Sequence, residues 1–491
     1  MAFEQDYYAI LGISPDADER VLKQAYRHLA RLFHPDTSQE TDAAIRFREV
    51  QEAYELLSDP LQREAYDHWR KREGLDRAIP LQLRVTPSQS TLACISEKQI
   101  LYVLIEITAS MDLDSERLPL NLGLVLDRST SMKGARLQKV KESARHIVEQ
   151  MGPSDILSLV TFSDRAQVVL PGQKSLNKSG AHTAIAGIYS DGGTELLQGL
   201  EAGLQQVQRW QSDDVHSHLI LLTDGQTYGD ELDCLATAKL SGKQGIPLTM
   251  IGIGYDWNDK LLDEMADLSH GSSVFIDSPS QISQVFDEQI QALGMVVAHN
   301  LRLTIHLAEN VSLRDIYRVS PQINRLRLVD EAVALGSLEQ HKPQAIMCEL
   351  LLESHTPSSH RLLRTAVEGT VLALGRQSVR ARQDIVIPFD STLSRRTPVP
   401  SDIVAAMGKL TIFKMQERAI AEVEQGKIGP AVNRLKTLAT RLLDVGEPEL
   451  ARAALLEAGR LARTGSLSTK GLKQIRYGTR GLTILPKEVQ P

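Results

Sequence analysis

The chain has 491 residues, 42% of them hydrophobic and 24% charged, which is ordinary for a globular protein of several domains. Its net charge of −7 has the wrong sign for a general nucleic-acid binder, so we expect no nucleic-acid partner. No apolar stretch reaches the roughly 20 residues of a membrane helix, and no signal peptide is visible. Three widely separated cysteines favour a reducing compartment. These features predict a cytoplasmic protein that does not insert into a membrane.

The first seventy residues predict two antiparallel helices packed through their apolar faces. One helix begins near Asp18 and runs to about Phe33, and the other ends at Asp59-Pro60, because a residue before proline disfavours helical angles. We expect Leu11 and Tyr66 to close the small core between them. The apolar stripes at helical spacing are Leu22, Tyr26, Leu29 and Phe33 on the first helix, and Phe47, Val50, Tyr54 and Leu57 on the second.

The loop between these helices carries the tripeptide His34-Pro35-Asp36. A rigid proline holds an imidazole and a carboxylate there, next to a basic helical stripe that includes Lys23, Arg27 and Arg31. This combination is typical of a docking surface, in which cations attract and a fixed polar tip makes the specific contact. The alternative is an ordinary turn beside a solvated face.

Residues 5–70 resemble a J domain, the module that defines Hsp70 co-chaperones, through DYYAILGI, KQAYRHLARLFHPD and FREVQEAYELLSDPLQREAYD. The resemblance assigns residues 1–73 to this domain. It implies that His34, Pro35 and Asp36 stimulate ATP hydrolysis by a DnaK-type Hsp70, and that the basic stripe engages the same partner. The chain departs from many J proteins after Trp69, where neither a Gly/Phe-rich stretch nor a cysteine-rich zinc module follows. Another part of the chain must therefore select the client.

Apolar strands alternate with helical stretches in the middle of the chain, which predicts a doubly wound α/β domain. The stretch 119–126 is almost uninterruptedly apolar, as expected of a parallel strand buried on both faces. Helices are expected after residue 131, at 195–210 and at 258–268. The other expected strands are residues 156–162, 166–170, 217–223, 247–253 and 272–276.

Three polar segments, residues 127–131, 192–194 and 223–225, are expected at the carboxyl edge of this sheet. Two carboxylates and three of the hydroxyls in these segments are candidate ligands, all oxygen donors, which suit Mg²⁺, Mn²⁺ or Ca²⁺ rather than zinc. A partner's carboxylate could complete the coordination of such an ion. The segment 127–131 taken alone is equally compatible with a helix N-cap.

Residues 119–296 resemble a von Willebrand factor A domain with its metal-ion-dependent adhesion site. The pattern Asp-x-Ser-x-Ser, then Thr, then Asp is complete in this sequence. The resemblance implies a bound divalent cation, with Mg²⁺ expected first and Mn²⁺ or Ca²⁺ as alternatives. The implied metal ligands are Asp127, Ser129, Ser131, Thr194 and Asp224.

The segments 80–118 and 297–395 both carry alternating, strand-like patterns joined by polar turns, with residues 324–329 among the expected strands and the next expected strand at 345–353. We expect them to form one β-sandwich with the α/β domain inserted between them, although two separate small sheets would give similar patterns. Residues 400–465 predict helices at 401–424, 428–445 and 447–464, the last two forming a hairpin that packs on the sandwich. The basic tail 466–491 is expected either to be a flexible arm or to dock on the body. The whole is thus a multidomain protein with α, α/β and β parts.

These parts predict a co-chaperone adaptor that is not an enzyme. The A domain would bind a specific protein through a metal-bridged carboxylate, while the J domain recruits Hsp70. The alternatives are a metal-dependent hydrolase, for which Glu195 is the one candidate base, or a scaffold for complex assembly. Residues 252–257 lack the third glycine of a dinucleotide fingerprint, and residues 172–175 lack the glycine that precedes the lysine of a P-loop.

Overall fold

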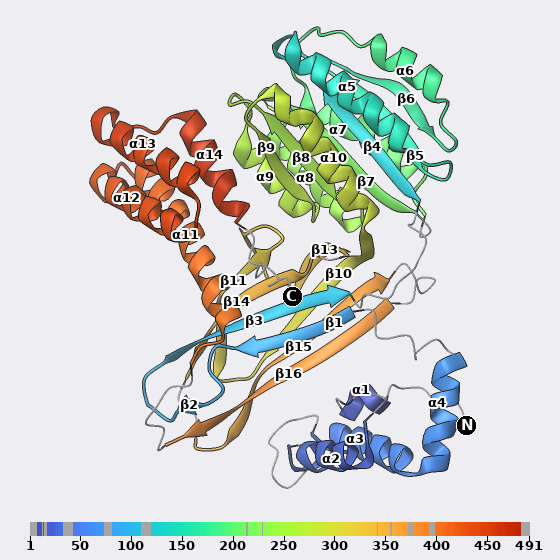
Figure 1. The fold of residues 1–491 in the computed structure, drawn as a ribbon, viewed down its shortest axis with the longest axis vertical. Helices are drawn as coiled ribbons and strands as arrows, with labels where there is room; N and C mark the ends of the chain where they lie inside the picture. The colour runs from blue at the N-terminus through green and yellow to red at the C-terminus, as the bar shows by residue number, and fades with distance from the viewer. Residues whose placement is uncertain are drawn as a thin grey trace. The chain divides into compact units, whose positions relative to one another are not determined.

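The computed structural model describes residues 7–11, 13, 17–32, 43–72, 81–109, 119–212, 215–227, 229–340, 342–353, 356–371, 378–391 and 398–482. The chain divides into two compact units, residues 1–80 and residues 81–491, and each is described by itself. Figure 1 labels their helices and strands. Within the described ranges, no helix combines the length and the apolar character that a membrane span requires.

The first unit is a set of short helices around a small aromatic core (Figure 1). The expected stripes on the two longer helices lie in this core, except for Phe33, which falls outside the described residues, and Leu11 and Tyr66 are buried in it as predicted. The Tyr66 hydroxyl accepts a hydrogen bond from the Tyr7 amide at 3.0 Å, which ties the first helix to the last. The helices are α1 (Tyr7–Leu11), α2 (Glu19–Leu32), α3 (Ala43–Ser58) and α4 (Pro60–Arg72).

The second unit contains a six-stranded sheet in the order β6-β5-β4-β7-β8-β9. Every residue of β4 is buried, as expected of a strand covered on both faces. All neighbours are parallel except β6, which runs antiparallel to β5 because a short turn joins the two. The strands are β4 (Leu120–Asp127), β5 (Ile156–Phe162), β6 (Ala166–Gln173), β7 (His216–Thr223), β8 (Leu248–Ile253) and β9 (Ser272–Ile276).

Helices cover both faces of this sheet, which confirms the doubly wound prediction (Figure 1). One face carries α5 (Ala135–Gln150), α6 (Lys178–Ala186) and α10 (Ile282–Gly294). The other carries α7 (Leu196–Gln208), α8 (Glu231–Lys243) and α9 (Asp259–Leu268). Two 3-10 turns, Thr130–Met132 and Pro279–Gln281, precede α5 and α10.

Two five-stranded sheets form the predicted sandwich, in the orders β1-β3-β14-β11-β12 and β13-β10-β15-β16-β2. Buried aliphatic side chains from both sheets make one core. The first sheet contains β1 (Leu81–Pro87), β3 (Gln99–Ala109), β14 (Gln344–Leu352), β11 (Val311–Ser320) and β12 (Asn324–Arg325). The second contains β13 (Ala332–Glu339), β10 (Val296–Leu307), β15 (Ser359–Val371), β16 (Ser378–Asp390) and β2 (Leu92–Ala93).

The α/β domain is inserted within this sandwich. Strand β3 precedes the insertion and β14 follows it, yet the two pair antiparallel from Gln99 opposite Leu352 to Ile107 opposite Gln344. Two sequence expectations need correction. The stretch 324–329, expected as a strand, contributes only the two residues of β12, and β13 was not anticipated.

The C-terminal helices are α11 (Ser401–Glu424), α12 (Ile428–Asp444), α13 (Pro448–Thr464) and α14 (Thr469–Arg480). Helix α11 packs on the outer face of the first sandwich sheet, where Phe413 meets the Tyr317 ring edge-on with 6.4 Å between centroids. The fourth helix, α14, lies in the segment expected as a basic tail.

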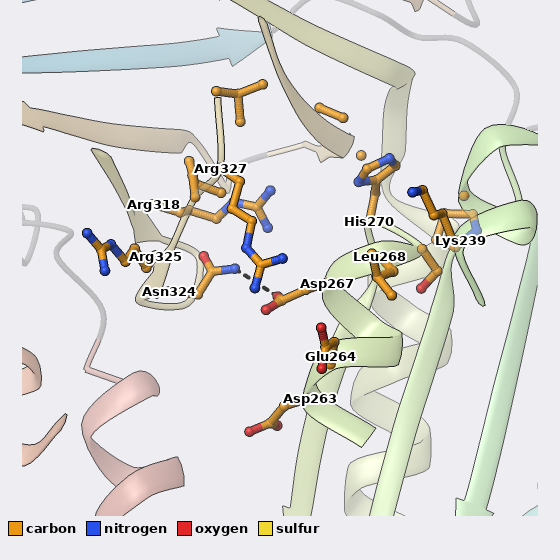
Figure 2. A pocket seen from close by; sticks show the side chains of 18 of the residues that line it. Lys239, Asp263, Glu264, Asp267, Leu268, His270, Arg318, Asn324, Arg325 and Arg327 are labelled. Carbon is orange, nitrogen blue, oxygen red and sulfur yellow. Dashed lines mark hydrogen bonds between the residues drawn. The ribbon is translucent and has the colours of Figure 1, made fainter. Parts of the chain in front are cut away.

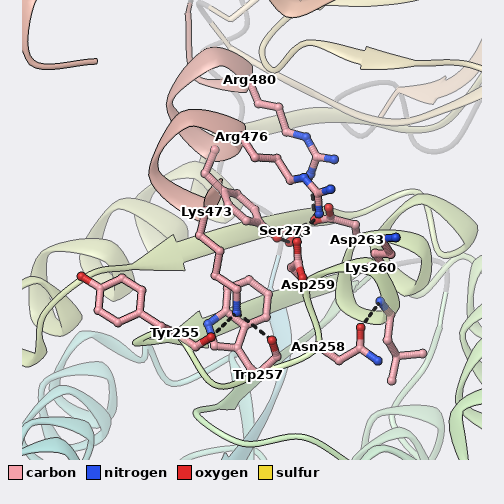
Figure 3. Close-up of polar contacts among 12 residues, drawn as sticks. Tyr255, Trp257, Asn258, Asp259, Lys260, Asp263, Ser273, Lys473, Arg476 and Arg480 are labelled. Carbon is pink, nitrogen blue, oxygen red and sulfur yellow. Dashed lines mark hydrogen bonds and ion pairs between the residues drawn. The ribbon is translucent and has the colours of Figure 1, made fainter. Parts of the chain in front are cut away.

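Helix α14 docks on the α/β domain, as Figure 3 shows. The buried Lys473 ammonium donates to the backbone oxygens of Tyr255 at 2.9 Å and Trp257 at 2.7 Å, and lies 3.9 Å from the Trp257 ring centroid. Arg480 pairs with Asp263 at 2.7 Å. Of the two readings left open for this segment, docking on the body is therefore the observed one for residues 469–480.

Candidate metal-binding site

The carboxyl ends of β4 and β7 bring the predicted ligands to one edge of the sheet. Asp127 is the last residue of β4, and Asp224 follows directly after β7. The two aspartates end neighbouring strands, because β4 and β7 pair in parallel along their length. The loop at 192–194 lies against the first segment, because Thr130 donates to the Gly192 oxygen from its amide at 3.1 Å and from its hydroxyl at 2.9 Å.

A chain of short hydrogen bonds connects the predicted ligands. The Ser129 and Ser131 hydroxyls are 2.9 Å apart, and Ser131 donates to Asp224 Oδ1 at 2.6 Å. The Ser129 amide donates to Asp127 Oδ1 at 2.7 Å. Four of the five residues are thus linked in one continuous chain of hydrogen bonds.

Thr194, the fifth predicted ligand, lies beside the same cluster. A methyl group added at Gly225 would come 2.9 Å from Thr194 Oγ1, so the absence of a side chain at Gly225 leaves room for the threonine. The loop before Thr194 is held by Asp164, whose Oδ1 accepts a hydrogen bond from the Gly193 amide at 2.7 Å.

Burial dominates the electrostatics of Asp127, whose side chain is inaccessible to solvent. It raises the pKa of Asp127 to about 6, and the charge of Asp224 adds to the rise, while hydrogen bonds from Thr223 and Ser129 oppose it. Two buried carboxylates side by side repel each other, so a cation placed between them would relieve that repulsion.

The donor set fits a hard divalent cation. Two carboxylates and three hydroxyls supply oxygen alone, which Mg²⁺, Mn²⁺ and Ca²⁺ prefer. Across the described ranges, no cluster of three or more His, Cys, Asp and Glu side chains suggests a second type of metal centre. The three cysteines, at 94, 234 and 348, are all free.

Two residues of this cluster were not among the predicted site residues, although Thr223 belongs to the predicted polar segment 223–225. Thr223 donates its hydroxyl hydrogen to Asp127 Oδ2 at 2.6 Å, and its place at a strand end next to Asp224 was a usable signal. Arg136 forms an ion pair with Asp224 Oδ2. Its signal was weaker: it is a basic residue in the first turn of a helix, where the helix dipole disfavours a cation.

Glu195, the candidate base of the hydrolase alternative, does not join this cluster. Its side chain is exposed, it makes no side-chain cap to α7, and its amide donates to the Ser163 oxygen at 2.8 Å. Neither of these features directs the carboxylate toward the five ligands.

The residues predicted to contact Hsp70 belong to the first unit. Lys23 and Arg27 are exposed on α2, and Lys23 pairs with Glu19 one turn earlier at 2.5 Å. The backbone of Arg31 continues α2, but its side chain lies outside the described atoms. The tripeptide 34–36 falls outside the described residues.

A separate cavity of about 1030 Å³ lies in the second unit, where the α/β domain, the sandwich and α11 meet. Figure 2 shows guanidinium groups of Arg318 and Arg327 together with Asp267 at this place. Asp267 accepts a hydrogen bond from the side-chain amide of Asn324 at 3.1 Å. Since cations and carboxylates both line the cavity, its charge favours no single class of ligand.

Comparison with known families matches three parts of the chain. Residues 6–67 match the DnaJ domain, residues 121–288 the von Willebrand factor type A domain, and residues 401–484 the Sll0103-like, C-terminal alpha-helical domain. DnaJ and von Willebrand A domains are in general non-catalytic modules, in agreement with the prediction of a protein that is not an enzyme.

Relatives of two kinds are among the matching proteins. A Synechocystis protein called uncharacterized protein sll0103 is 29% identical over 328 residues, which cover 65% of this chain and 77% of that protein. A curved DNA-binding protein of Pseudomonas putida and the chaperone protein DnaJ of Halothermothrix orenii are each 53% identical over 70 residues, or 14% of this chain. Those segments span 22% and 19% of the two relatives, so the likeness is confined to one module.

Solved structures share the fold of the larger unit. A von Willebrand factor type A protein from Catenulispora acidiphila superposes with a TM-score of 0.67 at 15% identity, covering 81% of this chain and 96% of that one. The ArnB paralog VWA2 from Sulfolobus acidocaldarius gives a TM-score of 0.50 at 15% identity, covering 82% and 98%. At such identities the likeness concerns the fold alone.

Proposed function

We propose that this chain, which joins a DnaJ domain to a von Willebrand factor A domain, is a co-chaperone adaptor. The A domain binds a specific protein through a divalent cation, and the J domain recruits a DnaK-type Hsp70 and stimulates its ATPase. The observation that carries the proposal is the convergence of five oxygen-bearing side chains at one sheet edge in a chain that also carries a J domain.

The chemistry of the site supports a binding role. Asp127, Asp224 and the three hydroxyls would hold the cation, and the cation would supply an attraction for a carboxylate of the partner. Asp127 and Asp224 formally balance a divalent cation, and the three other ligands are neutral hydroxyls that add no further negative charge to repel that carboxylate. No proton transfer or covalent step is needed for this recognition.

An increase in effective concentration gives a reason for both modules to occur on one chain. Capture of a client by the A domain raises the effective concentration of the J domain, and of any Hsp70 bound to it, around that client. The role would be assembly, remodelling or quality control of the captured protein, in a cytoplasmic setting and without nucleic acid.

The J-domain part is tested by steady-state ATP hydrolysis of a DnaK-type Hsp70. We expect the wild-type chain to raise the hydrolysis rate and His34→Gln to abolish the increase, because the imidazole belongs to the tip that the resemblance assigns to stimulation. His68→Gln is the matched control: the same substitution at an exposed histidine of α4, expected to leave the increase intact. Equal stimulation by wild type and His34→Gln would refute this part.

The A-domain part is tested by recovering partners from native lysate with Mg²⁺ or with chelator. We expect a set of proteins retained only with Mg²⁺ and lost with Asp127→Ala, which removes a carboxylate from the ligand set. Stimulation of Hsp70 should be unchanged in that variant. A partner set indifferent to both Mg²⁺ and Asp127→Ala would remove the cation from the recognition mechanism.

A further inference from the structure

We propose that Arg136 is an internal competitor for the metal-binding site: its guanidinium neutralises Asp224 and thereby weakens the binding of a divalent cation. This inference rests on the proposed function, because it concerns the cation that the same site would hold. Arg136 is not one of the predicted ligands.

The contacts of Arg136 aim its charge at the site. Its Nη1 pairs with Asp224 Oδ2 and lies 3.4 Å from the Ser131 backbone oxygen. The Asp224 side chain is fully buried, whereas that of Arg136 is 33% exposed, so the guanidinium covers the carboxylate from the solvent side. Since Ser131 occupies the other carboxylate oxygen at 2.6 Å, both oxygens of Asp224 are engaged.

The surrounding backbone makes room for this arrangement. Gly254, at the end of β8, has φ +71, and a Cβ added there would lie 3.1 Å from Arg136 Nη2. A residue with a side chain would be strained by that backbone angle and would also crowd the guanidinium. The turn after β8 therefore leaves the space in which the guanidinium lies.

The position of Arg136 is not explained by the helix that carries it. It is the second residue of α5, where the aligned peptide dipoles favour an anion and oppose a cation. The ion pair with a buried carboxylate must outweigh that unfavourable interaction. The side chain is thus placed for Asp224 rather than for helix stability.

Counting charges shows the consequence for a cation. Asp127 and Asp224 alone present two negative charges, but with Arg136 the site presents one. A divalent cation that enters must compete with the guanidinium for Asp224 and bind beside a fixed positive charge. The loaded site then carries one net positive charge instead of none, and this charge would favour the binding of an acidic partner.

Mn²⁺ titration of the full-length chain tests this competition. Chelator-treated wild type, Arg136→Gln, Arg136→Lys and Arg145→Gln would be titrated with Mn²⁺, with free Mn²⁺ measured by its paramagnetic resonance signal. We expect Arg136→Gln to lower the Kd for Mn²⁺ roughly tenfold or more, because one unit of repulsion is removed from the site. Arg136→Lys keeps the charge and should stay within a few-fold of wild type.

Arg145→Gln is the matched control, since it removes the same charge from the same helix without a contact to Asp224. It should leave the Kd unchanged. Equal affinities of Arg136→Gln and Arg145→Gln, or weaker binding by Arg136→Gln, would overturn the inference. If Arg136→Gln does not fold, an Arg136→Lys Kd more than tenfold below wild type would overturn it, and a wild-type-like Kd would support it. Failure of the wild type itself to bind Mn²⁺ would instead overturn the metal-binding part of the proposed function.

Discussion

Asp127 is held in a setting that opposes its own ionisation. The carboxylate is buried beside Asp224, and only the hydrogen bonds from Thr223 and Ser129 support its charge. The folded state therefore binds the Asp127 proton more tightly than the unfolded state, and from this group the free energy of unfolding falls as pH rises from about 4 to about 6. A cation in the site would remove that cost, so the same residue links ligand binding to stability.

We predict that Asp127→Asn stabilises the chelator-treated protein at pH 7 by roughly 1–3 kcal/mol, because it removes a buried charge. The amide oxygen can still accept from the Ser129 amide, and the amide nitrogen can donate to the Thr223 hydroxyl in place of accepting from it. The gain should vanish near pH 4, where wild-type Asp127 is itself protonated. Urea unfolding monitored by circular dichroism at the two pH values measures this, with the exposed Asp444→Asn as the control. A destabilised variant at pH 7, or an equal gain at both pH values, would contradict the account.

Helix α14 connects the end of the chain with the α/β domain inserted in its middle. Its contacts include the turn after β8, through Lys473, and α9, through Arg480 (Figure 3). The Tyr477 hydroxyl also donates to Asp263 of α9 at 2.7 Å. A buried ammonium group is costly unless it is well paired, and here two carbonyl oxygens and an indole ring surround it.

We predict that Lys473→Met destabilises the second unit by roughly 1–3 kcal/mol, because two buried backbone oxygens lose their donor while the volume is nearly kept. Amide hydrogen exchange in residues 469–480 should accelerate more than in α12. Lys436→Met, on an exposed position of α12, is the control and should change neither quantity. Unchanged exchange in α14 would show that Lys473 does not hold the helix in place.

At the scale of the whole molecule, the chain combines two units with separate cores. Among the residues that the structure describes, the core of the first unit draws on residues before 80, and the cores of the second draw on residues after 80. Separate cores favour separate unfolding transitions, since cooperativity depends on shared buried contacts. Binding of a client and recruitment of Hsp70 would then be distributed over two structures that fold independently.

We predict that Leu57→Ala, in the core of the first unit, lowers one calorimetric transition and leaves the other in place. Removal of this buried side chain should cost roughly 2–5 kcal/mol in the unit that contains it. Leu61→Ala, the same substitution at a leucine that is 77% exposed, should alter neither transition. A shift of both transitions by Leu57→Ala would mean that the two units unfold together.

The sequence alone predicted the helices and strands whose determining contacts are local or whose apolar residues follow a strict period. The apolar stripes predicted α2 and α3, and uninterrupted apolar runs predicted β4 and β7. The carboxyl ends of parallel strands must share one edge, so the sequence alone predicts that the ligand residues lie together. Strand β13 was not predicted, because Gly336, at φ +78, interrupts the alternation of its side chains, and its register against β10 shifts there.

Only the tertiary structure decided the contacts between segments far apart in the chain. Local propensity does not encode the pairing of β3 with β14, the docking of α14 on the turn after β8, or the ion pair between Arg136 and Asp224. Each depends on which surfaces remain available once the sheets and helices have formed, because long-range contacts are selected by packing and charge rather than by sequence period. The sequence thus determined the modules and the candidate oxygen ligands, whereas only the tertiary structure brought the Arg136 guanidinium beside Asp224.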